Sequence, residues 1–167
     1  GVRALLKAAR IQGAQVSEDD VAFVLAPRIN AAGRMHHASA AFRLLVSEDA
    51  VEADRLAGEL TQTNVERQRR TAQVFEACRE QIGERPDRPA VFAGDPGWPA
   101  GLLGLVAGKL VQQYGVPAVV YGGLNGQVVA SGRSIPGIDI MAVLAVTRPF
   151  LAKAGGHAQA CGFTLIE

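Results

Sequence analysis

Residues 117–134 read PAVVYGGLNGQVVASGRS, and this stretch decides the fold of the second half of the chain. The Asn-Gly dipeptide at 125–126 stands between two apolar runs, which is the strongest short-range signal of a β-hairpin turn. We therefore predict strands over 117–121 and 127–134, joined by a turn at 122–126.

The segments around this hairpin alternate between strand and helix signals. The sequence predicts a short buried strand over 90–93, a glycine-rich turn over 94–101, a helix over 101–114, a second helix over 140–147 and a last strand over 161–166. This alternation indicates an α/β fold, in which a small mixed sheet carries the helices.

The first half of the chain shows helical periodicity instead. Helices are expected over 2–10, 17–25 and 38–46, and a long helix should run from a cap at Ser47-Glu48-Asp49 to about Ile82. A loop is expected over 27–36, because Pro27 disfavours a helical backbone conformation at the residue before it, so that the preceding helix should end there.

These signals divide the chain into two domains. We predict a helical domain over 1–83, a Pro-containing linker over 84–88 and an α/β domain over 89–167. The first residue is Gly1 rather than Met, which suggests a segment of a longer protein.

Composition restricts the class of protein. The chain is 49% hydrophobic and 20% charged, values that exclude a disordered chain. No apolar run is long enough for a membrane span and no signal-peptide pattern opens the chain, so we expect a cytoplasmic protein with no membrane partner. Cys78 and Cys161 match no metal spacing and are expected as reduced thiols.

The charged residues favour a protein that binds particular phosphate groups over a protein that binds polyanions nonspecifically. The net charge is only +1, but 14 of the 17 cations are arginines. Arginine presents a planar fork that grips phosphate through two parallel hydrogen bonds. A compositional bias of the genome is the alternative reason for so many arginines.

Three glycine-containing segments each present a side chain that can bind phosphate. They are PRINAAGR at 27–34, ASGRSIPG at 130–137 and AGGHAQACG at 154–162. Glycine lets the backbone adopt conformations, and approach a ligand, in ways that a Cβ would block.

The second segment, Ser131-Gly132-Arg133-Ser134, ends a predicted strand. A guanidinium between two hydroxyls suits a phosphodiester. The alternative is that Arg133 pairs with a local carboxylate such as Asp139.

The third segment presents His157 after Gly155 and Gly156, in a predicted turn. The imidazole could donate to a phosphate oxygen, or a backbone carbonyl could satisfy it. In the first segment, Asn30 and Arg34 occupy the predicted loop, from which Arg34 could reach across a cleft.

Two histidines, a tryptophan and two glycines can each be interpreted as functional or as structural residues. The adjacent His36 and His37 have no acidic or thiol neighbour, so a surface or helix-start position is favoured over a metal site. Trp98 could stack on a base or cover the edge of the core. Gly104 and Gly108 are expected to allow close packing of a helix on the sheet.

The sequence contains no recognisable catalytic centre. A phosphodiester hydrolase needs clustered carboxylates that hold metals, or a nucleophile with its base. Between residues 89 and 167 the acids are Asp95, Asp139 and Glu167 only. We therefore predict no catalytic residue, metal or cofactor site in this chain.

The motifs LAPRINAAGRM (25–35), SGRSI (131–135) and GGHAxAxG (155–162), with Asn64-x-x-Arg67, resemble the carboxyl-terminal half of RecJ-like single-strand-specific exonucleases of the DHH/DHHA1 phosphoesterase superfamily. The resemblance covers essentially the whole chain. It implies a helical connector followed by a DHHA1 domain.

The resemblance also implies partners and roles. A DHH domain outside this chain would hold two divalent metals, manganese or magnesium, and degrade single-stranded DNA from its 5′ end. Ser131, Arg133 and His157 would hold phosphates of the strand, and Arg34 would reach toward the scissile bond. One departure is Pro99 after Trp98, where many relatives have histidine.

Three alternatives remain open. The chain could belong to a smaller DHH phosphoesterase that acts on short oligonucleotides or cyclic dinucleotides. It could be a non-catalytic nucleic-acid-binding module, as DHHA1 domains are in alanyl-tRNA synthetases. The catalytic half could also be degenerate, leaving a scaffold.

Overall fold

The computed structural model describes residues 1–11, 15–84 and 88–166, which fall into two compact units, Gly1–Arg69 and Arg70–Glu167. The division lies inside one long helix. The predicted linker over 84–88 stays a prediction, since residues 85–87 lie outside the described residues.

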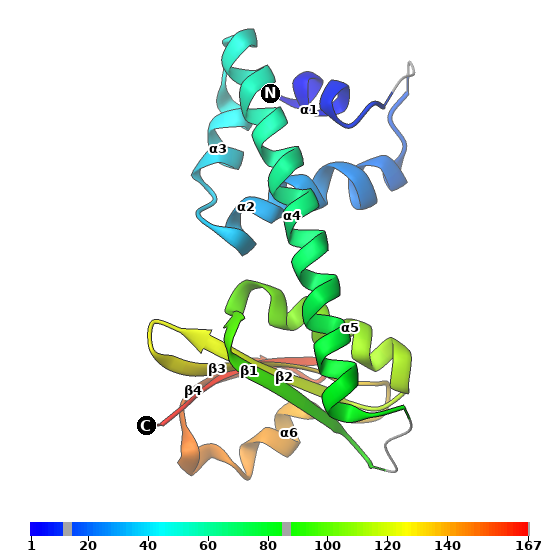
Figure 1. Ribbon diagram of the computed structural model, residues 1–167, viewed down its shortest axis with the longest axis vertical. Coiled ribbons are helices and arrows are strands. Elements are labelled where there is room, and N and C mark those ends of the chain that lie inside the picture. Colours follow the sequence, from blue (N-terminus) through cyan, green and yellow to red (C-terminus); the bar gives the residue numbers. More distant parts are fainter. Residues whose placement is uncertain (12–14, 85–87, 167) are drawn as a thin grey trace. The chain divides into compact units, whose positions relative to one another are not determined.

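The first unit is helical (Figure 1). Its elements are α1 (Val2–Ala8), the π-helix η1 (Asp20–Leu25), α2 (Ala26–Met35), α3 (Ser39–Val46) and the first turns of α4 (Ala50–Ile82). The core consists of small and aliphatic residues, among which Leu5, Leu44, Leu56 and Leu60 are fully buried. Asp49, the last residue of the predicted cap over Ser47-Glu48-Asp49, caps α4, because its carboxylate accepts from the N–H groups of Val51 and Glu52.

The prediction of a loop over 27–36 is wrong, because this segment is the helix α2. Pro27 lies in the first turn of α2, where its fixed φ suits the helix. The π-helical turns of η1 precede it directly, so the chain stays helical through the proline. Asn30 and Arg34 therefore lie on a helix and not on a loop.

The second unit is built on a five-stranded mixed sheet in the order β1-β2-β3-β5-β4. Only β1 and β2 pair in parallel, and the other pairs are antiparallel. The elements are β1 (Val91–Pro99), α5 (Ala100–Tyr114), β2 (Ala118–Leu124), β3 (Gln127–Arg133), α6 (Ile140–Ala145), the short 3-10 helix η2 (Arg148–Phe150), β4 (Leu151–His157) and β5 (Ala160–Leu165). The predicted α/β class with a mixed sheet is confirmed.

Two of the predicted turns are strands. β1 continues through the glycine-rich segment to Pro99, with an irregularity in its pairing between Gly94 and Pro99. The Gly-Gly-His segment belongs to β4, and the turn that follows it is confined to residues 158–159.

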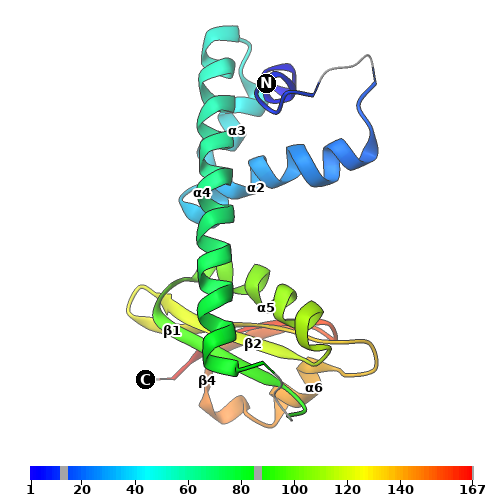
Figure 2. The ribbon, with the colours of Figure 1, turned by 45° about the vertical axis from the view of Figure 1, so that its right-hand side comes forward.

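The helices of the second unit lie on opposite faces of the sheet. α5 covers β1, β2 and β3, whereas α6 lies against β4 and β5 on the other face (Figures 1 and 2). The last turns of α4 also pack on the α5 side, where Val74 and Cys78 join the buried core. The Gln81 amide fixes them to the sheet, since its oxygen accepts from the Gly94 N–H at 2.9 Å.

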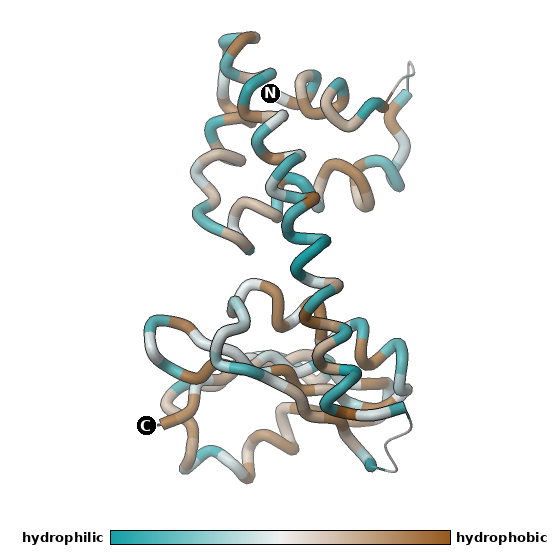
Figure 3. The backbone as a smooth tube through the Cα atoms, in the orientation of Figure 1, coloured by the Kyte–Doolittle hydropathy of each residue, from teal (hydrophilic) through white to brown (hydrophobic). Residues whose placement is uncertain are grey.

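Figure 3 shows hydrophilic residues along the middle of α4, the longest described helix. Within the described ranges, no helix combines the length and the apolar character that a membrane span requires.

Candidate nucleic-acid interface

Strand β3 places Ser131 and Arg133 on the face that α5 covers. Because side chains alternate along a strand, these two residues share a face and Gly132 points to the other. The contacts of helix α5 show the same arrangement: a Cβ added at Gly104 would lie 2.8 Å from Arg133 Nη2 and 3.3 Å from Ser131 Oγ. Gly104 thus leaves the space that the guanidinium occupies.

Cross-strand pairing extends this polar surface from β3 over β5 to β4. Arg133 pairs with Ala160, which pairs with His157. Residues directly opposite each other on antiparallel strands share a face. The Arg133 and His157 side chains, 24 positions apart in the sequence, therefore flank one alanine on the same side of the sheet.

The adjacent row consists of Ser131, Gly162 and Gly155, and it opens into a groove of about 340 Å³. A Cβ at Gly155 would meet nothing within 4 Å, so backbone forms the floor of the groove here. The residues that line the groove are Ala100, Leu103, Leu124, Val129, Ala130, Ser131, Lys153, Ala154, Gly155, Gly162, Phe163 and Thr164. None of them is acidic.

Arg133 is half-buried and keeps its charge unpaired within the described residues. Its Nη1 donates to the Gly132 carbonyl at 2.8 Å. Asp139, the carboxylate that could have neutralised it, caps α6 instead and accepts from the N–H groups of Met141 at 2.9 Å and Ala142 at 3.2 Å. The guanidinium is therefore held in place by the backbone while its charge remains available to an anion.

His157 ends β4 with an exposed side chain. Its Nδ1 accepts from the Gln159 N–H at 3.3 Å, so the proton of the neutral ring lies on Nε2, which can donate to a ligand. The preceding Gly156 has a φ of +153°, and a Cβ there would lie 2.1 Å from the Ala160 carbonyl oxygen. The glycine is thus required by the close approach of β4 to β5, and the histidine is presented by a strand end rather than by the predicted turn.

Two of the predicted contacts have other partners. The Ser134 hydroxyl is buried and donates to the Ile138 carbonyl at 2.7 Å, so its proton is engaged. Gly132 faces the α6 side, where a Cβ would meet Cys161 Sγ at 2.6 Å and Ile140 Cδ1 at 2.7 Å. Phosphate binding by Ser134 and Gly132 stays a prediction, and the geometry gives both a structural role.

The first unit contains a separate pair of arginines. Asn30 and Arg34 lie four positions apart on one face of α2. The pKa of the Arg67 guanidinium lies below its ordinary value, first because the group is partly buried and second because the positive charge of Arg34 is near. Asn64, which is buried on α4, accepts from Arg67 Nη2 at 2.9 Å.

The described ranges contain no group of three or more His, Cys, Asp or Glu side chains that could hold a metal ion. His37 Nδ1 accepts from the Ser39 N–H at 3.2 Å, at the start of α3. This contact fits the helix-start position that the sequence favoured.

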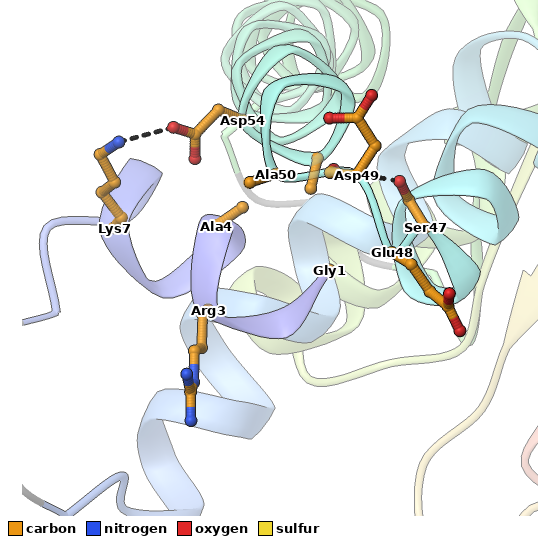
Figure 4. A pocket seen from close by; sticks show the side chains of 10 residues that line it. Gly1, Arg3, Ala4, Lys7, Ser47, Glu48, Asp49, Ala50 and Asp54 are labelled. Carbon is orange, nitrogen blue, oxygen red and sulfur yellow. Dashed lines mark hydrogen bonds and ion pairs between the residues drawn. The ribbon is translucent and has the colours of Figure 1, made fainter.

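The first unit also has a cavity of about 380 Å³ between α1 and the start of α4 (Figure 4). Lys7 forms an ion pair with Asp54 at 2.6 Å across it. Arg3, Glu48 and Asp49 line the same cavity, so cations and anions are mixed. None of the predicted binding residues lies there, and its charges favour no particular ligand.

The expected close packing on the sheet holds for Gly104, where a Cβ would meet Arg133 and Ser131 of β3, but not for Gly108, where it would meet nothing within 4 Å. Sequence reasoning missed two residues of the groove. Lys153 and Thr164 were not singled out at all. The signal that finds them is the period-2 alternation of β4 and β5, which is readable only once β4 is known to be a strand.

Comparison with known proteins agrees with these motifs. The DHHA1 domain family matches residues 87–167. The single-stranded-DNA-specific exonuclease RecJ of Bacillus subtilis is 38% identical over 168 residues, which cover 99% of this chain and 21% of that protein. RecJ of Escherichia coli is 32% identical over 177 residues, covering 100% of this chain and 31% of that protein.

The crystal structure of Thermus thermophilus RecJ in complex with Mg²⁺ superimposes with a TM-score of 0.88 at 32% identity, covering 99% of this chain and 26% of that one. The chain thus spans about a fifth to a third of the length of the curated relatives it matches. These matches show that the chain is a RecJ-like segment and that its residues 87–167 belong to the DHHA1 domain family.

Proposed function

We propose that this chain is the strand-holding part of a RecJ-like exonuclease that degrades single-stranded DNA from the 5′ end. In this proposal the chain grips the phosphates of the strand. The hydrolytic step takes place in a DHH domain outside the chain, which would supply two divalent metals, manganese or magnesium.

The observation that carries the proposal is the common face of Ser131, Arg133 and His157 beside an open groove. A hydroxyl, a guanidinium and an imidazole Nε2–H are all hydrogen-bond donors, and phosphate oxygens are acceptors. The β-strands hold the three donors on a rigid backbone, so little conformational entropy of the protein is lost when the DNA strand binds.

The charge distribution supports the same conclusion. Within the described residues Arg133 has no carboxylate partner, and no acidic residue lines the groove. A phosphate that enters meets fixed positive charge without having to displace a competing carboxylate. We propose that Asn30 and Arg34 of the first unit also contact phosphates of the nucleic acid.

The first test is binding of a single-stranded oligothymidylate to the 167-residue chain, measured by fluorescence anisotropy at low salt. A charge-assisted hydrogen bond contributes about 1.5–3 kcal/mol, so Arg133→Ala should weaken binding roughly ten- to a hundredfold. The slope of log K against log salt should also become shallower by about 0.7, since one phosphate contact is lost on a single strand.

Arg79→Ala is the matched control, because Arg79 forms only an exposed ion pair with Glu76 on α4. It removes the same charge away from the groove and should leave affinity unchanged. Equal affinity of Arg133→Ala and the parent chain, with unchanged melting temperatures, would exclude the proposed phosphate role.

Two further measurements separate this proposal from its alternatives. An exonuclease part should prefer oligonucleotides of increasing length, whereas a phosphoesterase for short substrates should bind a dinucleotide as tightly as a twentymer. The purified chain should also show no nuclease activity with manganese, and reproducible cleavage by it would contradict the assignment of chemistry to another domain.

A further inference from the structure

The groove beside the proposed phosphate contacts contains a third cross-strand row to which no role has been given. Val129 on β3 pairs with Thr164 on β5, and Thr164 pairs with Lys153 on β4. All three residues line the groove together with Ser131 and Gly155. The row therefore lies on the same face as the Arg133–Ala160–His157 and Ser131–Gly162–Gly155 rows.

Lys153 carries an uncompensated charge at this place. Its side chain is exposed, and within the described residues it takes part in no hydrogen bond or ion pair. Three acids of the second unit have other partners, since Asp95 accepts from the Gly97 N–H, Asp139 caps α6 on the opposite face and Glu76 pairs with Arg79 on α4. A lysine on an edge strand can also serve only to prevent pairing with another sheet, and the test below distinguishes that role.

The geometry of the strands sets the spacing between the rows. Successive residues on one face of a strand are about 6.6–6.8 Å apart. This step is comparable to the separation of successive phosphates in an extended single strand. The row of Arg133, the row of Ser131 and the row of Lys153 can thus face consecutive nucleotides along β4 and β5.

We propose that Lys153 and Thr164 form a subsite for the nucleotide two positions along the DNA strand from the one held by Arg133 and His157. Lys153 Nζ pairs with its phosphate, and the Thr164 hydroxyl donates to a phosphate or sugar oxygen. The apolar wall of Leu103, Leu124 and Val129 covers one side of its sugar and base. This inference rests on the proposed function and sharpens it, because a subsite of this kind selects oligonucleotides over mononucleotides.

The test compares ligand lengths on the whole 167-residue chain. Affinities for thymidine 5′-monophosphate and for an eight-nucleotide oligothymidylate are measured by calorimetry at low salt, for the parent chain and for Lys153→Ala. We expect a three- to tenfold loss for the octamer and no change for the mononucleotide. The salt slope for the octamer should fall by about 0.7.

Three variants complete the design. Lys153→Arg keeps the charge and should retain octamer affinity, and Thr164→Val should lower it two- to fivefold. Lys109→Ala is the charge-matched control, because Lys109 lies over the Phe75 ring on the α4 side of α5 and does not line the groove.

The outcomes separate the inference from the function on which it rests. Unchanged octamer affinity of Lys153→Ala, while Arg133→Ala binds weakly, overturns the subsite and leaves the proposed function standing. The same holds if Lys153→Ala only increases self-association in size-exclusion chromatography, or if it weakens mononucleotide and octamer binding equally. No measurable octamer binding by the parent chain overturns both proposals.

Discussion

The two faces of the strands β3, β5 and β4 have opposite chemistry. On the α5 side, alternate residues are Arg133, Ser131, His157 and Lys153 beside a groove without acidic residues. On the α6 side, a groove of about 330 Å³ is lined by apolar side chains and Thr147, and Phe150 and Val143 remain largely exposed. In Figure 3 the segment of α6 is hydrophobic.

This contrast teaches that one strand serves two purposes through its period of two residues. Positions facing α5 present groups for a ligand, and the residues between them pack toward α6. A substitution on the first face should therefore change binding with little effect on folding. A substitution on the second face should do the reverse.

The strongest test of this separation is a pair of adjacent glycines on β4. A Cβ at Gly156, which faces α6, would lie 2.1 Å from the Ala160 carbonyl oxygen, and its φ of +153° is one that side chains rarely adopt. Gly156→Ala should cost about 3 kcal/mol or more of the free energy of unfolding, measured by urea denaturation.

Gly155→Ala is the matched control, because a Cβ there meets nothing within 4 Å. It should leave the urea midpoint nearly unchanged and lower single-strand affinity by narrowing the groove. Equal stability losses for the two variants would break the distinction between the faces.

The second test uses two glycines on α5. Gly104→Ala places a methyl group where Arg133 Nη2 lies, and the flexible guanidinium must move away. We expect a three- to tenfold loss of affinity for an oligothymidylate, with little change in melting temperature. Anisotropy titrations together with thermal melts measure both quantities.

Gly108→Ala provides the comparison, since nothing lies within 4 Å of a Cβ at Gly108. Replacing glycine in a helix interior by alanine should raise stability by about 0.5–1 kcal/mol and leave affinity unchanged. If both alanines affect affinity alike, Gly104 has no special relation to Arg133.

The third test concerns the α6 side alone. The Asp139 carboxylate caps α6 through two backbone N–H groups, and loss of such a cap costs about 1 kcal/mol. Asp139→Ala should therefore lower stability by that amount without lowering affinity for single strands. A marked loss of binding by a folded Asp139→Ala chain would show that this carboxylate acts on the ligand face after all.

The smallest expected effect involves the thiol in the core on the α5 side. Burial raises the pKa of Cys78 from 9.0 to about 12. The unfolded thiol ionises near pH 9 while the folded one stays neutral, so its contribution to stability is present below pH 9 and is lost as the pH rises toward 12.

Between pH 8 and 9.5 this loss amounts to about 0.8 kcal/mol. In Cys78→Ala, the decrease in the free energy of unfolding between these two pH values should be smaller by that amount, as measured by denaturation at both pH values. Cys161, whose pKa is also raised by burial, lines the open apolar groove and should react faster with small thiol reagents. Faster labelling of Cys78 would contradict its place in the closed core.

The parts of the fold that could be predicted from the sequence are those with local signals. The Asn-Gly turn defined β2 and β3, and the apolar run after Pro99 defined α5. β4 was missed because its residues are small, glycine-rich and poor strand formers, and its strand character comes from pairing with β5. α2 was missed because Pro27 is tolerated only through its position in the first turn.

The same limit applies to the candidate site. Ser131, Arg133 and His157 could be named from their residue types and glycine neighbours. Their common face could not, because it depends on the register of β3, β5 and β4, and register is a property of the folded sheet. The role of Gly104 likewise required the position of a helix relative to a strand.

The strand order also has a consequence for how this surface forms. β5 lies between β3 and β4 in the sheet but follows both in the chain. During synthesis, Arg133 and His157 leave the ribosome before the strand that brings them together. Until β5 inserts, β3 has an unpaired edge, and intermediates in folding lack the surface altogether. Ligand affinity of partly folded or truncated chains therefore reports closure of the sheet rather than the presence of the arginine.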